Sequence, residues 1–487
     1  MTTALLCATV TADTMAGLRH RRDLVRGADL VELRLDGVCD LDVAGALAGR
    51  RTRVVATCRP SWQGGRYDGD EQARVAILEA AWTLGAEYVD VEDGAAAALM
   101  RRSGGARIVR SFHDFDRVPA DAAARLRALL ASGAEVVKLA AMTHRLADVV
   151  TLADLARTAG GRAVVIGMGP CGVASRILAA QFGSLWTYAG EGVAPGQLPL
   201  GRMRDEFHVP RVTPHTAVYG LVGQPVDHSL SPAMHNAAFR AAGIDAVYVP
   251  LPAADFADFE HFARAFRIRG VSVTAPYKLD AHRVAAGATD AAGLGAINTL
   301  RRTDDGWEGR NTDIEGFLGP LAGRTLRGAR VSVLGAGGAA RGVAAALSGA
   351  GAHVRLHARR AEAAQATATA CGVVAGPWPP DDDWNILVNA TPVGTAPRVD
   401  DTPVRFSGSL AGRLVYDLVY NPLETALMRQ ARRQGADVLG GLPMLVAQAA
   451  AQFYWWTGQH PSSSLMLDAA RTRLDSVGRS SDGDGSL

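Results

Sequence analysis

A lysine and a histidine in the first half of the chain lie where carbonyl chemistry is possible. Lys138 lies inside the apolar run V-V-K-L-A-A, and His113 closes another such run in S-F-H-D-F. An amine in a buried run is desolvated, which favours the neutral form that attacks a carbonyl carbon. Imidazole can take and return a proton near neutral pH. The pair therefore permits an imine mechanism, although His113 can be structural and Lys138 can instead pair with Glu32 or Asp36 or extend to solvent.

Eight short apolar runs, each followed by a segment with helical spacing, position these residues. Such a series predicts either a (β/α)8 barrel or a doubly wound open sheet. Polar residues at the carboxyl ends of the runs, such as Arg34, Arg59 and His113, favour the barrel, because barrel active sites are built at that end. The runs are Ala4–Val10, Leu30–Leu35, Arg53–Cys58, Glu87–Val91, Arg107–Phe112, Glu135–Ala140, Arg162–Ile166 and Ser184–Tyr188.

A glycine-rich turn in the second half could hold a dinucleotide. The apolar run Val331–Leu334 precedes Gly335, Gly337 and Ala340 in a G-x-G-x-x-A pattern, and an alanine-rich helical segment follows. Glycines allow the tight turn and let backbone N–H groups approach a pyrophosphate at the start of a helix. The context therefore predicts a Rossmann-type lobe.

The next expected strand of that lobe, His353–His357, indicates which dinucleotide binds. It ends in Ala358-Arg359-Arg360, where an NAD-binding strand would have an acidic residue for the ribose hydroxyl. Guanidinium groups suit a 2′-phosphate, so the pattern favours NADP, the alternative being a solvated basic loop.

Two further polar groups follow an expected strand in this half. The run Gly270–Thr274 is followed by A-P-Y-K, which puts Thr274 and Lys278 beyond the strand end, and G-R-N-T-D supplies Asp313. A lysine and an aspartate so far apart in sequence can equally form a surface pair.

A new strand–helix pattern begins at Tyr219–Asn236. Ser229 and Ser231 precede a helix that Pro232 opens, with Ser231 as a suitable cap. The preceding stretch, Asp205–His215, contains two prolines and reads as a linker.

Composition narrows the class of protein. The 487 residues suffice for several domains, and a net charge of +2 without a basic stripe gives no indication of nucleic-acid binding. Five scattered cysteines without a C-x-x-C predict a reducing compartment and no structural zinc, and the N-terminus lacks a secretory pattern. Asp437–Asp468 has no charged residue between its ends but contains glycine, proline and glutamine, so a buried helix is favoured over a membrane span.

The first half resembles type I 3-dehydroquinate dehydratase over about residues 1–205. The motifs E-L-R-L-D, T-C-R-P, S-F-H-D-F, V-V-K-L-A, M-G-P-C-G-V-A-S-R, F-G-S-L-W-T-Y and A-P-G-Q occur in this order. The resemblance implies a (β/α)8 barrel in which Lys138 forms the Schiff base, His113 is the general acid/base and Arg176 holds the substrate carboxylate. It also places Glu32, Arg34, Arg59 and Gln197 around the substrate.

Two positions depart from that family's pattern. Gln63 stands where the family usually has a glutamate that supports the catalytic histidine, and Val193 stands where a serine usually precedes A-P-G-Q. Gln63 can accept a hydrogen bond from His113 but cannot stabilise an imidazolium by charge. We expect activity to survive at a reduced rate.

The second half resembles shikimate dehydrogenase over about residues 217–475. The motifs are H-S-L-S-P-A-M-H-N, V-T-A-P-Y-K, G-A-I-N-T, G-R-N-T-D, L-V-N-A-T-P-V-G-T, Y-D-L-V-Y-N-P and G-G-L-P-M-L-V-A-Q. The resemblance implies that Lys278 and Asp313 handle the proton of the reacting oxygen. It implies substrate contacts from Ser229, Ser231, Thr274, Asn298, Tyr420 and Gln448, and NADP contacts from Gly335, Ala336, Gly337, Gly338, Ala339, Arg359, Thr391 and Gly441.

Together the resemblances predict a bifunctional enzyme of the shikimate pathway, because one half makes the substrate of the other. The expected domains are a barrel at 1–205, a linker at 206–216, a substrate-binding domain at 217–322 completed by helices at 441–475, a Rossmann NADP domain at 323–440 and a disordered tail at 478–487. Two alternatives stay open: a quinate dehydrogenase fusion, and a catalytically weakened regulatory descendant. We expect a cytoplasmic enzyme, a monomer or weak homodimer, that acts on small molecules without nucleic acid, membrane or metal.

Overall fold

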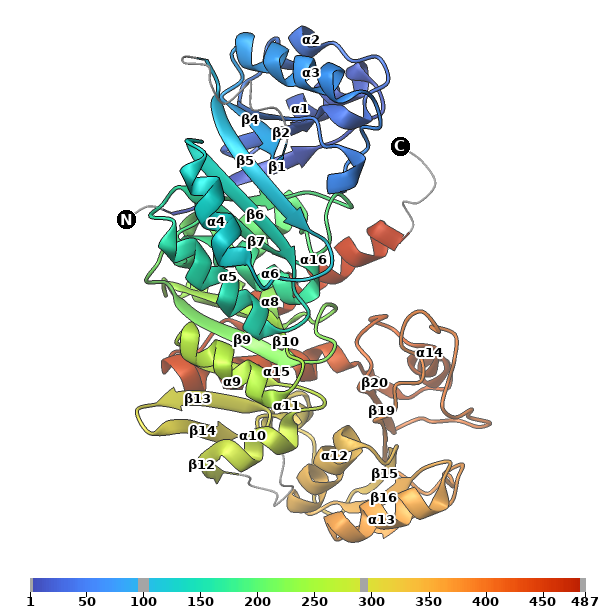
Figure 1. The fold of residues 1–487 in the computed structure, drawn as a ribbon. Helices are drawn as coiled ribbons and strands as arrows, with labels where there is room; N and C mark the ends of the chain where they lie inside the picture. Colours follow the sequence, from blue (N-terminus) through green and yellow to red (C-terminus); the bar gives the residue numbers. More distant parts are fainter. Residues whose placement is uncertain (1–2, 95–104, 290–296, 482–487) are drawn as a thin grey trace. The chain divides into compact units, whose positions relative to one another are not determined.

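The computed structural model describes residues 3–94, 105–289 and 297–481 (Figure 1). The chain divides into two compact units. The first comprises 1–232 and 244–269, and the second comprises 233–243 and 270–487. The predicted domain boundaries, which follow the order of motifs, stay predictions.

The first unit is built around an eight-stranded parallel sheet in the order β7-β6-β5-β4-β3-β2-β1-β8. Leu185 N–H donates to Ala163 O at 2.9 Å, which links the segments at the two ends of this order. The predicted barrel is therefore confirmed over the open sheet. The strands are β1 (Leu5–Val10), β2 (Leu30–Arg34), β3 (Arg53–Thr57), β4 (Tyr88–Glu92), β5 (Arg107–Asp114), β6 (Val136–Met142), β7 (Ala163–Met168) and β8 (Trp186–Ala189). The helices are α1 (Met15–Leu24), α2 (Val43–Leu47), α3 (Glu71–Thr83), α4 (Ala122–Ala131), α5 (Leu146–Thr158), α6 (Gly169–Ile177) and α7 (Ala179–Phe182).

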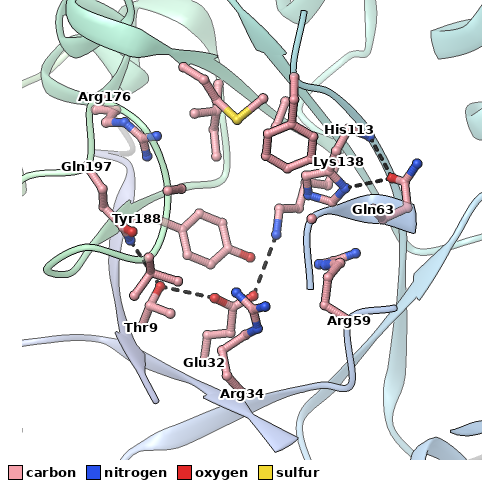
Figure 2. A pocket seen from close by; sticks show the side chains of 17 residues that line it. Thr9, Glu32, Arg34, Arg59, Gln63, His113, Lys138, Arg176, Tyr188 and Gln197 are labelled. Carbon is pink, nitrogen blue, oxygen red and sulfur yellow. Dashed lines mark hydrogen bonds and ion pairs between the residues drawn. The ribbon is translucent and has the colours of Figure 1, made fainter. Parts of the chain in front are cut away.

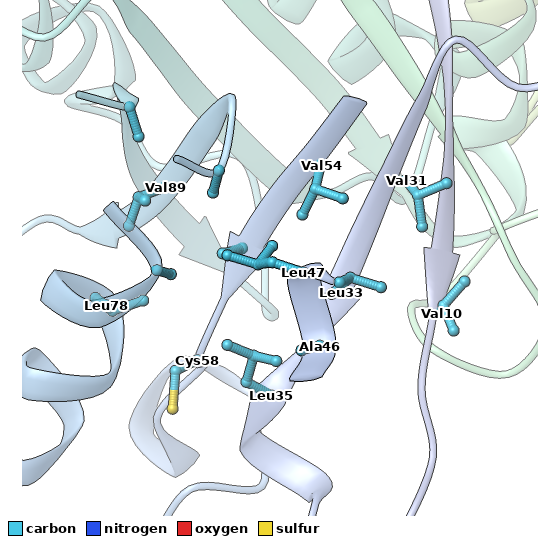
Figure 3. Close-up of a cluster of buried hydrophobic side chains, with 14 of the residues drawn as sticks. Val10, Val31, Leu33, Leu35, Ala46, Leu47, Val54, Cys58, Leu78 and Val89 are labelled. Carbon is cyan, nitrogen blue, oxygen red and sulfur yellow. The ribbon is translucent and has the colours of Figure 1, made fainter. Parts of the chain in front are cut away.

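Strand alternation separates the outer core of the barrel from its interior. Val31 and Leu33 of β2 belong to a buried cluster that includes side chains of α1, α2 and α3 (Figure 3). Leu30, on the opposite phase, belongs to another buried cluster with Tyr88 and Trp186. Successive side chains of a strand point to opposite faces. Glu32 and Arg34 therefore share the interior phase of Leu30.

Two strands of the second sequence half also belong to the first unit. The strands β9 (Ala217–Gly223) and β10 (Ala246–Pro252) pair in parallel, and α9 (Phe256–Ala265) packs on α5. A short helical turn at Arg202–Glu206 leads into the expected linker, which contains another at Val209–Arg211. Helix α8 (Ser231–Ala241) begins at Ser231, one residue before Pro232.

The Rossmann-type sheet in the second unit has six parallel strands in the order β17-β16-β15-β18-β19-β20. Numbered by chain position this is 3-2-1-4-5-6, the order whose switch point between β15 and β18 holds dinucleotides in doubly wound folds. The strands are β15 (Arg330–Leu334), β16 (His353–His357), β17 (Val374–Ala375), β18 (Ile386–Asn389), β19 (Leu414–Asp417) and β20 (Asp437–Leu439), and the helices are α12 (Gly338–Gly349), α13 (Ala361–Cys371) and α14 (Ala426–Arg433).

The rest of the second unit includes a smaller group of strands and the last helices. The strand β13 pairs antiparallel with β11 and β14, and β12 pairs in parallel with β14. The elements are β11 (Gly270–Val273), α10 (Lys278–Val284), β12 (Ala285–Thr289), β13 (Thr299–Thr303), β14 (Gly306–Arg310), α11 (Asp313–Leu318), α15 (Gly441–Thr457) and α16 (Ser463–Ser481).

The C-terminal segment differs from its prediction. Helix α16 continues to Ser481, so residues 478–481, expected to be disordered, are helical; the rest of that predicted tail lies outside the described residues. Within the stretch Asp437–Asp468, which has no charged residue between its ends, the main helix is α15. It is capped by Gly458 in a left-handed conformation (φ 72°). Over the described part of the chain, no helix is both long and apolar enough to cross a bilayer.

Candidate functional site

One pocket of the barrel gathers every residue predicted for the dehydratase site (Figure 2). All residues that line this pocket, taken together, come from six different strands and from loops and helices beyond strand ends, because alternation turns every second side chain inward. The pocket is lined by Thr9, Glu32, Arg34, Arg59, Gln63, Gly64, His113, Phe115, Lys138, Ala140, Ile166, Met168, Arg176, Tyr188, Val193, Ala194 and Gln197.

Lys138 extends from β6 between acidic and aromatic partners. Its side chain is 7% exposed, and its Nζ lies 3.1 Å from Asp90 Oδ2 and 3.6 Å from Glu32 Oε1. The ring of Tyr188 lies 4.3 Å from the same nitrogen. Of the two ion pairs that the sequence allowed for Lys138, the one with Glu32 is present. Asp36 instead accepts two hydrogen bonds from Arg34. The amine is thus buried as expected, but its surroundings are partly ionic rather than apolar.

Asp90, which the sequence analysis did not single out, connects Lys138 to a buried ionic network. Its Oδ2 accepts from Arg59 at 2.8 Å as well as from Lys138, and Ser111 donates to its Oδ1. Burial alone would raise its pKa, but the charges of Arg59 and Lys138 hold that pKa well below the ordinary range. Asp90 alternates with apolar Val89 and Val91 on β4, and this alternation was the available signal.

Arg59 is occupied by protein carboxylates. Besides Asp90, its guanidinium donates to Glu92 at 2.7 Å and to Ser111 at 2.9 Å. Glu92 also accepts from Arg74 of α3, a fully buried side chain, at 2.6 Å. The geometry therefore makes Arg59 a residue that orients Asp90, and its predicted contact with substrate stays a prediction.

His113 is held in one tautomer by Gln63. Gln63 Oε1 accepts from the His113 backbone N–H at 3.0 Å and lies 3.1 Å from Nδ1. An amide oxygen only accepts, so Nδ1 carries the proton and Nε2 keeps its lone pair. Burial, and then the nearby charges of Arg59 and Lys138, lower the pKa of His113 well below 6.5. The imidazole is therefore neutral and can act as a base through Nε2.

The two glycines after Gln63 allow this arrangement. Gly64 adopts a left-handed conformation (φ 71°), and a Cβ there would lie 2.4 Å from the ring of Phe115, which stacks on His113. A Cβ at Gly65 would lie 1.9 Å from the carbonyl oxygen of Arg59. Any larger residue would displace the loop that carries Gln63.

Arg176 is a buried cation beside the A-P-G-Q loop. Its Nη2 donates to Pro195 O at 3.2 Å, and its Nε has no hydrogen-bond partner among the described residues. Burial lowers its pKa to about 10, which leaves it charged at neutral pH. Gln197 donates to Thr9 at 3.1 Å, and Val193 lines the same wall. An unpaired guanidinium of this kind suits a planar carboxylate from a ligand.

A second lysine–aspartate pair lies in the second unit. Lys278 and Asp313 begin α10 and α11, and Nζ donates to Oδ2 at 2.5 Å. Asn298 donates to the other oxygen of Asp313 at 2.8 Å and accepts from the Thr312 N–H, which fixes the carboxylate. The Lys278 side chain is 36% exposed and that of Asp313 22% exposed, so both can meet a ligand.

The other predicted dehydrogenase residues are divided between the units. Thr274 follows β11. Gln448 of α15 packs against Gly316 of α11, where an added Cβ would lie 2.7 Å from the Gln448 Cβ. Tyr420 is partly exposed. Ser229 and Ser231 belong to the first unit, where Ser229 Oγ accepts from the Ser231 N–H at 3.2 Å. Their expected role in the same site as Lys278 stays a prediction.

A buried glutamine in α15 was not predicted from the sequence. Gln452 is 1% exposed; its Oε1 accepts from Ser272 at 2.7 Å and its Nε2 donates to Thr299 at 3.0 Å. Thr299 in turn donates to Asn298 Oδ1, so Gln452 supports the residue that fixes Asp313. The signal is that Gln452 lies one helical turn beyond Gln448.

The glycine-rich turn after β15 has the form that a pyrophosphate needs. Gly335 adopts φ 120° and faces Ala390 O, which begins the loop after β18. A Cβ at Gly337 or Gly338 would meet no described atom within 4 Å, and α12 starts there without a side-chain cap. The first N–H groups of a helix have no partner within that helix, so this uncapped start suits an anion. The remaining expected positions there are Ala336 and Ala339.

Three further residues predicted for NADP lie at the carboxyl edge of this sheet. Arg359 is exposed after β16, and Thr391 donates to Asn389 Oδ1 in the turn after β18. Gly441 starts α15, where a Cβ would lie 2.0 Å from Leu418 O, so only glycine fits. The residues present therefore fit a dinucleotide with a 2′-phosphate.

Fold and site geometry define a two-part enzyme with a lysine-centred barrel and a nicotinamide-type oxidoreductase. Residues 6–213 match the family model of type I 3-dehydroquinase, 221–300 that of the shikimate dehydrogenase substrate binding domain, and 441–471 that of the shikimate 5′-dehydrogenase C-terminal domain.

Known proteins match both parts. A bifunctional 3-dehydroquinate dehydratase/shikimate dehydrogenase, chloroplastic, from Arabidopsis thaliana is 33% identical over 93% of this chain and 82% of its own length. A shikimate dehydrogenase (NADP(+)) of Anaeromyxobacter sp. (strain Fw109-5) is 41% identical over 53% of this chain and 97% of its own. The shikimate 5-dehydrogenase of Thermus thermophilus, solved with NADP(H) and shikimate, is 36% identical with a TM-score of 0.49, over 53% of this chain and 99% of its own. The chain belongs to the family of bifunctional 3-dehydroquinate dehydratase/shikimate dehydrogenases.

Proposed function

We propose that the barrel pocket converts 3-dehydroquinate to 3-dehydroshikimate through an imine on Lys138, and that the second site reduces this product to shikimate with NADPH. The observation that carries the dehydratase assignment is the meeting of Lys138, His113 and Arg176 around one pocket. Each supplies a different requirement: a nucleophile, a neutral base and an anion site.

Arg176 binds the carboxylate of the substrate, and this orientation points the ring ketone toward Lys138. The amine adds to the carbonyl carbon, and loss of water gives the imine. The attacking form of Lys138 is the free amine, and Asp90 and Glu32, 3.1 and 3.6 Å from its Nζ, hold that nitrogen in position. The Tyr188 ring and the buried strand keep bulk water from the nitrogen.

His113 then takes up a proton as a base and later releases it as an acid. Its Nε2 takes the proton from the carbon beside the imine, and the electrons pass into the imine. The imidazolium returns the proton to the departing hydroxyl, which leaves as water. Hydrolysis of the product imine restores Lys138. Gln63 keeps the tautomer correct but adds no charge to stabilise the imidazolium, which supports the expected reduced rate.

Lys278 and Asp313 serve the second reaction. When bound, NADPH would supply the hydride in the forward direction. The ring oxygen gains its proton from Lys278 or Asp313, which share one hydrogen bond and are both partly exposed. Asn298 holds the carboxylate in place, while Arg359 and the turn at Gly335 would hold the 2′-phosphate and pyrophosphate. Ser229 and Ser231 are proposed to read the carboxylate. The cytoplasmic location and the monomer or weak dimer belong to the same proposal.

Borohydride trapping tests the imine step. We expect 3-dehydroquinate plus borohydride to leave a covalent adduct, which peptide mass spectrometry places on Lys138. Absence of an adduct under turnover conditions would exclude the mechanism. Steady-state rates with shikimate and quinate, each with NADP and NAD, test the second assignment, and a preference for quinate would support the catabolic alternative.

A further inference from the structure

A buried carboxylate from the dehydrogenase sequence caps a dehydratase helix. Asp258, in the first turn of α9, has a side chain with 0% exposure. Its Oδ2 accepts from the Leu146 N–H at 2.9 Å and its Oδ1 from the Ala147 N–H at 2.8 Å. Leu146 and Ala147 start α5, where backbone N–H groups have no partner within their own helix. The negative charge also lies at the favourable end of the helix dipole.

Asp258 is itself fixed from the dehydrogenase side. The same Oδ2 accepts from the Ala254 N–H at 3.1 Å, and Asp255 accepts from the Asp258 N–H at 2.8 Å. Arg145 contacts Asp258 Oδ1 at 3.3 Å. One carboxylate therefore serves the first turns of two helices from different halves of the sequence, and both helices lie in the first unit.

The start of α5 is connected to the dehydratase pocket by short contacts. α5 follows β6, the strand of Lys138, through residues 143–145. In this loop, the N–H and hydroxyl of Thr143 both donate to Met168 O, at 3.0 and 2.7 Å, and Met168 lines the pocket. The next residue, Gly169, donates to Pro195 O at 3.1 Å, the same oxygen that accepts from Arg176. An unbroken series of contacts thus runs from Asp258 to the carboxylate-binding wall.

The helix that carries Arg176 has a second contact with the dehydrogenase sequence. The thiol of Cys171 on α6 donates to Pro252 O of β10 at 3.2 Å. Phe182 of α7 stacks on Phe266, just after α9, with ring centroids 5.5 Å apart. The wall of the pocket around Arg176 therefore rests on β10 and α9 at several points.

We propose that Asp258 is a positioning residue of the dehydratase, supplied by the dehydrogenase part of the chain. It fixes the first turn of α5 and thereby the wall formed by Met168, Pro195 and Arg176. The proposal rests on the assignment of Lys138 and Arg176 to the dehydratase site. It predicts that loss of the cap weakens substrate binding more than the chemistry at Lys138.

The test compares Asp258→Ala and Asp258→Asn with Asp154→Asn in the full chain. Asp154 is an exposed acidic residue of α5 that pairs with Arg157, so its variant changes the same helix without touching the cap. Dehydratase activity is normalised to the number of sites trapped by borohydride. Hydrogen exchange is followed in peptides covering residues 143–150, and shikimate oxidation is measured in parallel.

We expect Asp258→Ala to raise the dehydratase KM about threefold to tenfold, the range that loss of a helix cap allows. Turnover per trapped site and shikimate oxidation should change by less than about twofold. The asparagine variant keeps one acceptor oxygen and should give an intermediate KM, whereas Asp154→Asn should match the unaltered chain. Hydrogen exchange at 143–150 should be slowest in the unaltered chain, faster in Asp258→Asn and fastest in Asp258→Ala.

An unchanged KM despite faster exchange at 143–150 would overturn the proposal. So would a dehydratase loss that follows only the number of trapped sites, because that outcome indicates a folding role alone. If the alanine variant does not fold, the asparagine variant decides by the same criteria. Absence of trapping in the unaltered chain would instead overturn the site assignment, and this proposal with it.

Discussion

Lys138 and Lys278 both face an aspartate, but the two pairs lie in different surroundings. Lys138 and Asp90 are 7% and 0% exposed, and Asp90 is further held by Arg59 and Ser111. Lys278 and Asp313 are 36% and 22% exposed, with one supporting amide. A covalent step needs a nucleophile fixed before the substrate arrives, whereas a proton relay needs groups that a ligand can reach. The same residue pair therefore suits different reactions according to how deeply it is buried.

The largest effects are expected from one substitution in each lysine–aspartate pair, because each should abolish a different activity. Lys138→Ala removes the proposed nucleophile and should lower dehydratase turnover by at least about 10⁴-fold, with shikimate oxidation unchanged. Asp313→Asn should lower shikimate oxidation by about 10²- to 10⁴-fold and leave dehydration unchanged. Steady-state assays of both reactions on each purified variant check this. A parallel loss of both activities in either variant would mean that the two sites do not act independently.

Arg359 is expected to determine which dinucleotide the oxidoreductase site prefers. Arg359→Ala should raise the KM for NADPH by about 10- to 100-fold, because one charge-assisted contact with the 2′-phosphate is lost, and should change the KM for NADH little. Arg360→Ala, at the neighbouring exposed arginine, serves as the matched control. If both variants affect the two cofactors equally, the A-R-R turn does not read the phosphate.

The smallest effect is expected from a substitution of Gln63, because it changes only whether the hydrogen-bond partner of the His113 ring is neutral or charged. In Gln63→Glu a carboxylate would face Nδ1–H, raise the pKa of His113 and stabilise the imidazolium, increasing dehydratase kcat by about fivefold near neutral pH. The base acts when neutral, so activity persists as pH falls until that pKa is reached. In the unaltered chain the pKa of His113 lies well below 6.5, so the acid limb is low; in Gln63→Glu it should move upward.

The pH profile of kcat/KM for dehydration measures this shift, with Gln63→Leu as the counterpart that removes the acceptor. An acid limb at the same pH in all three proteins would show that residue 63 does not control His113.

Much of the barrel and its pocket could be predicted from the sequence, because strand alternation is a local property. Eight apolar runs fixed the strands to within a few residues, and His113, Lys138 and Arg176 meet in one pocket. Asp90 was missed because a carboxylate inside a strand reads as an interruption until its neighbours Arg59 and Lys138 are known.

Other features depend on contacts that no local pattern shows. Arg59 was predicted to contact the substrate, which stays a prediction, but its ion pairs with Asp90 and Glu92 of β4 were not predicted. Gln452 and Asp258 act through partners more than a hundred residues away in sequence. The helical ending of α16 beyond Gly478 follows from continuation of a helix into a polar segment, where composition alone suggested disorder.

The unpaired cation at Arg176 has a consequence for inhibitor chemistry. The guanidinium is buried and forms no ion pair with a carboxylate of the described residues. A ligand must therefore supply the negative charge that neutralises it. A compound that keeps the ring but replaces its carboxylate by an ester or amide would leave the guanidinium buried without compensation. Inhibitors of the dehydratase should therefore retain an anionic group at this position, and a larger hydrophobic surface elsewhere would not substitute for it.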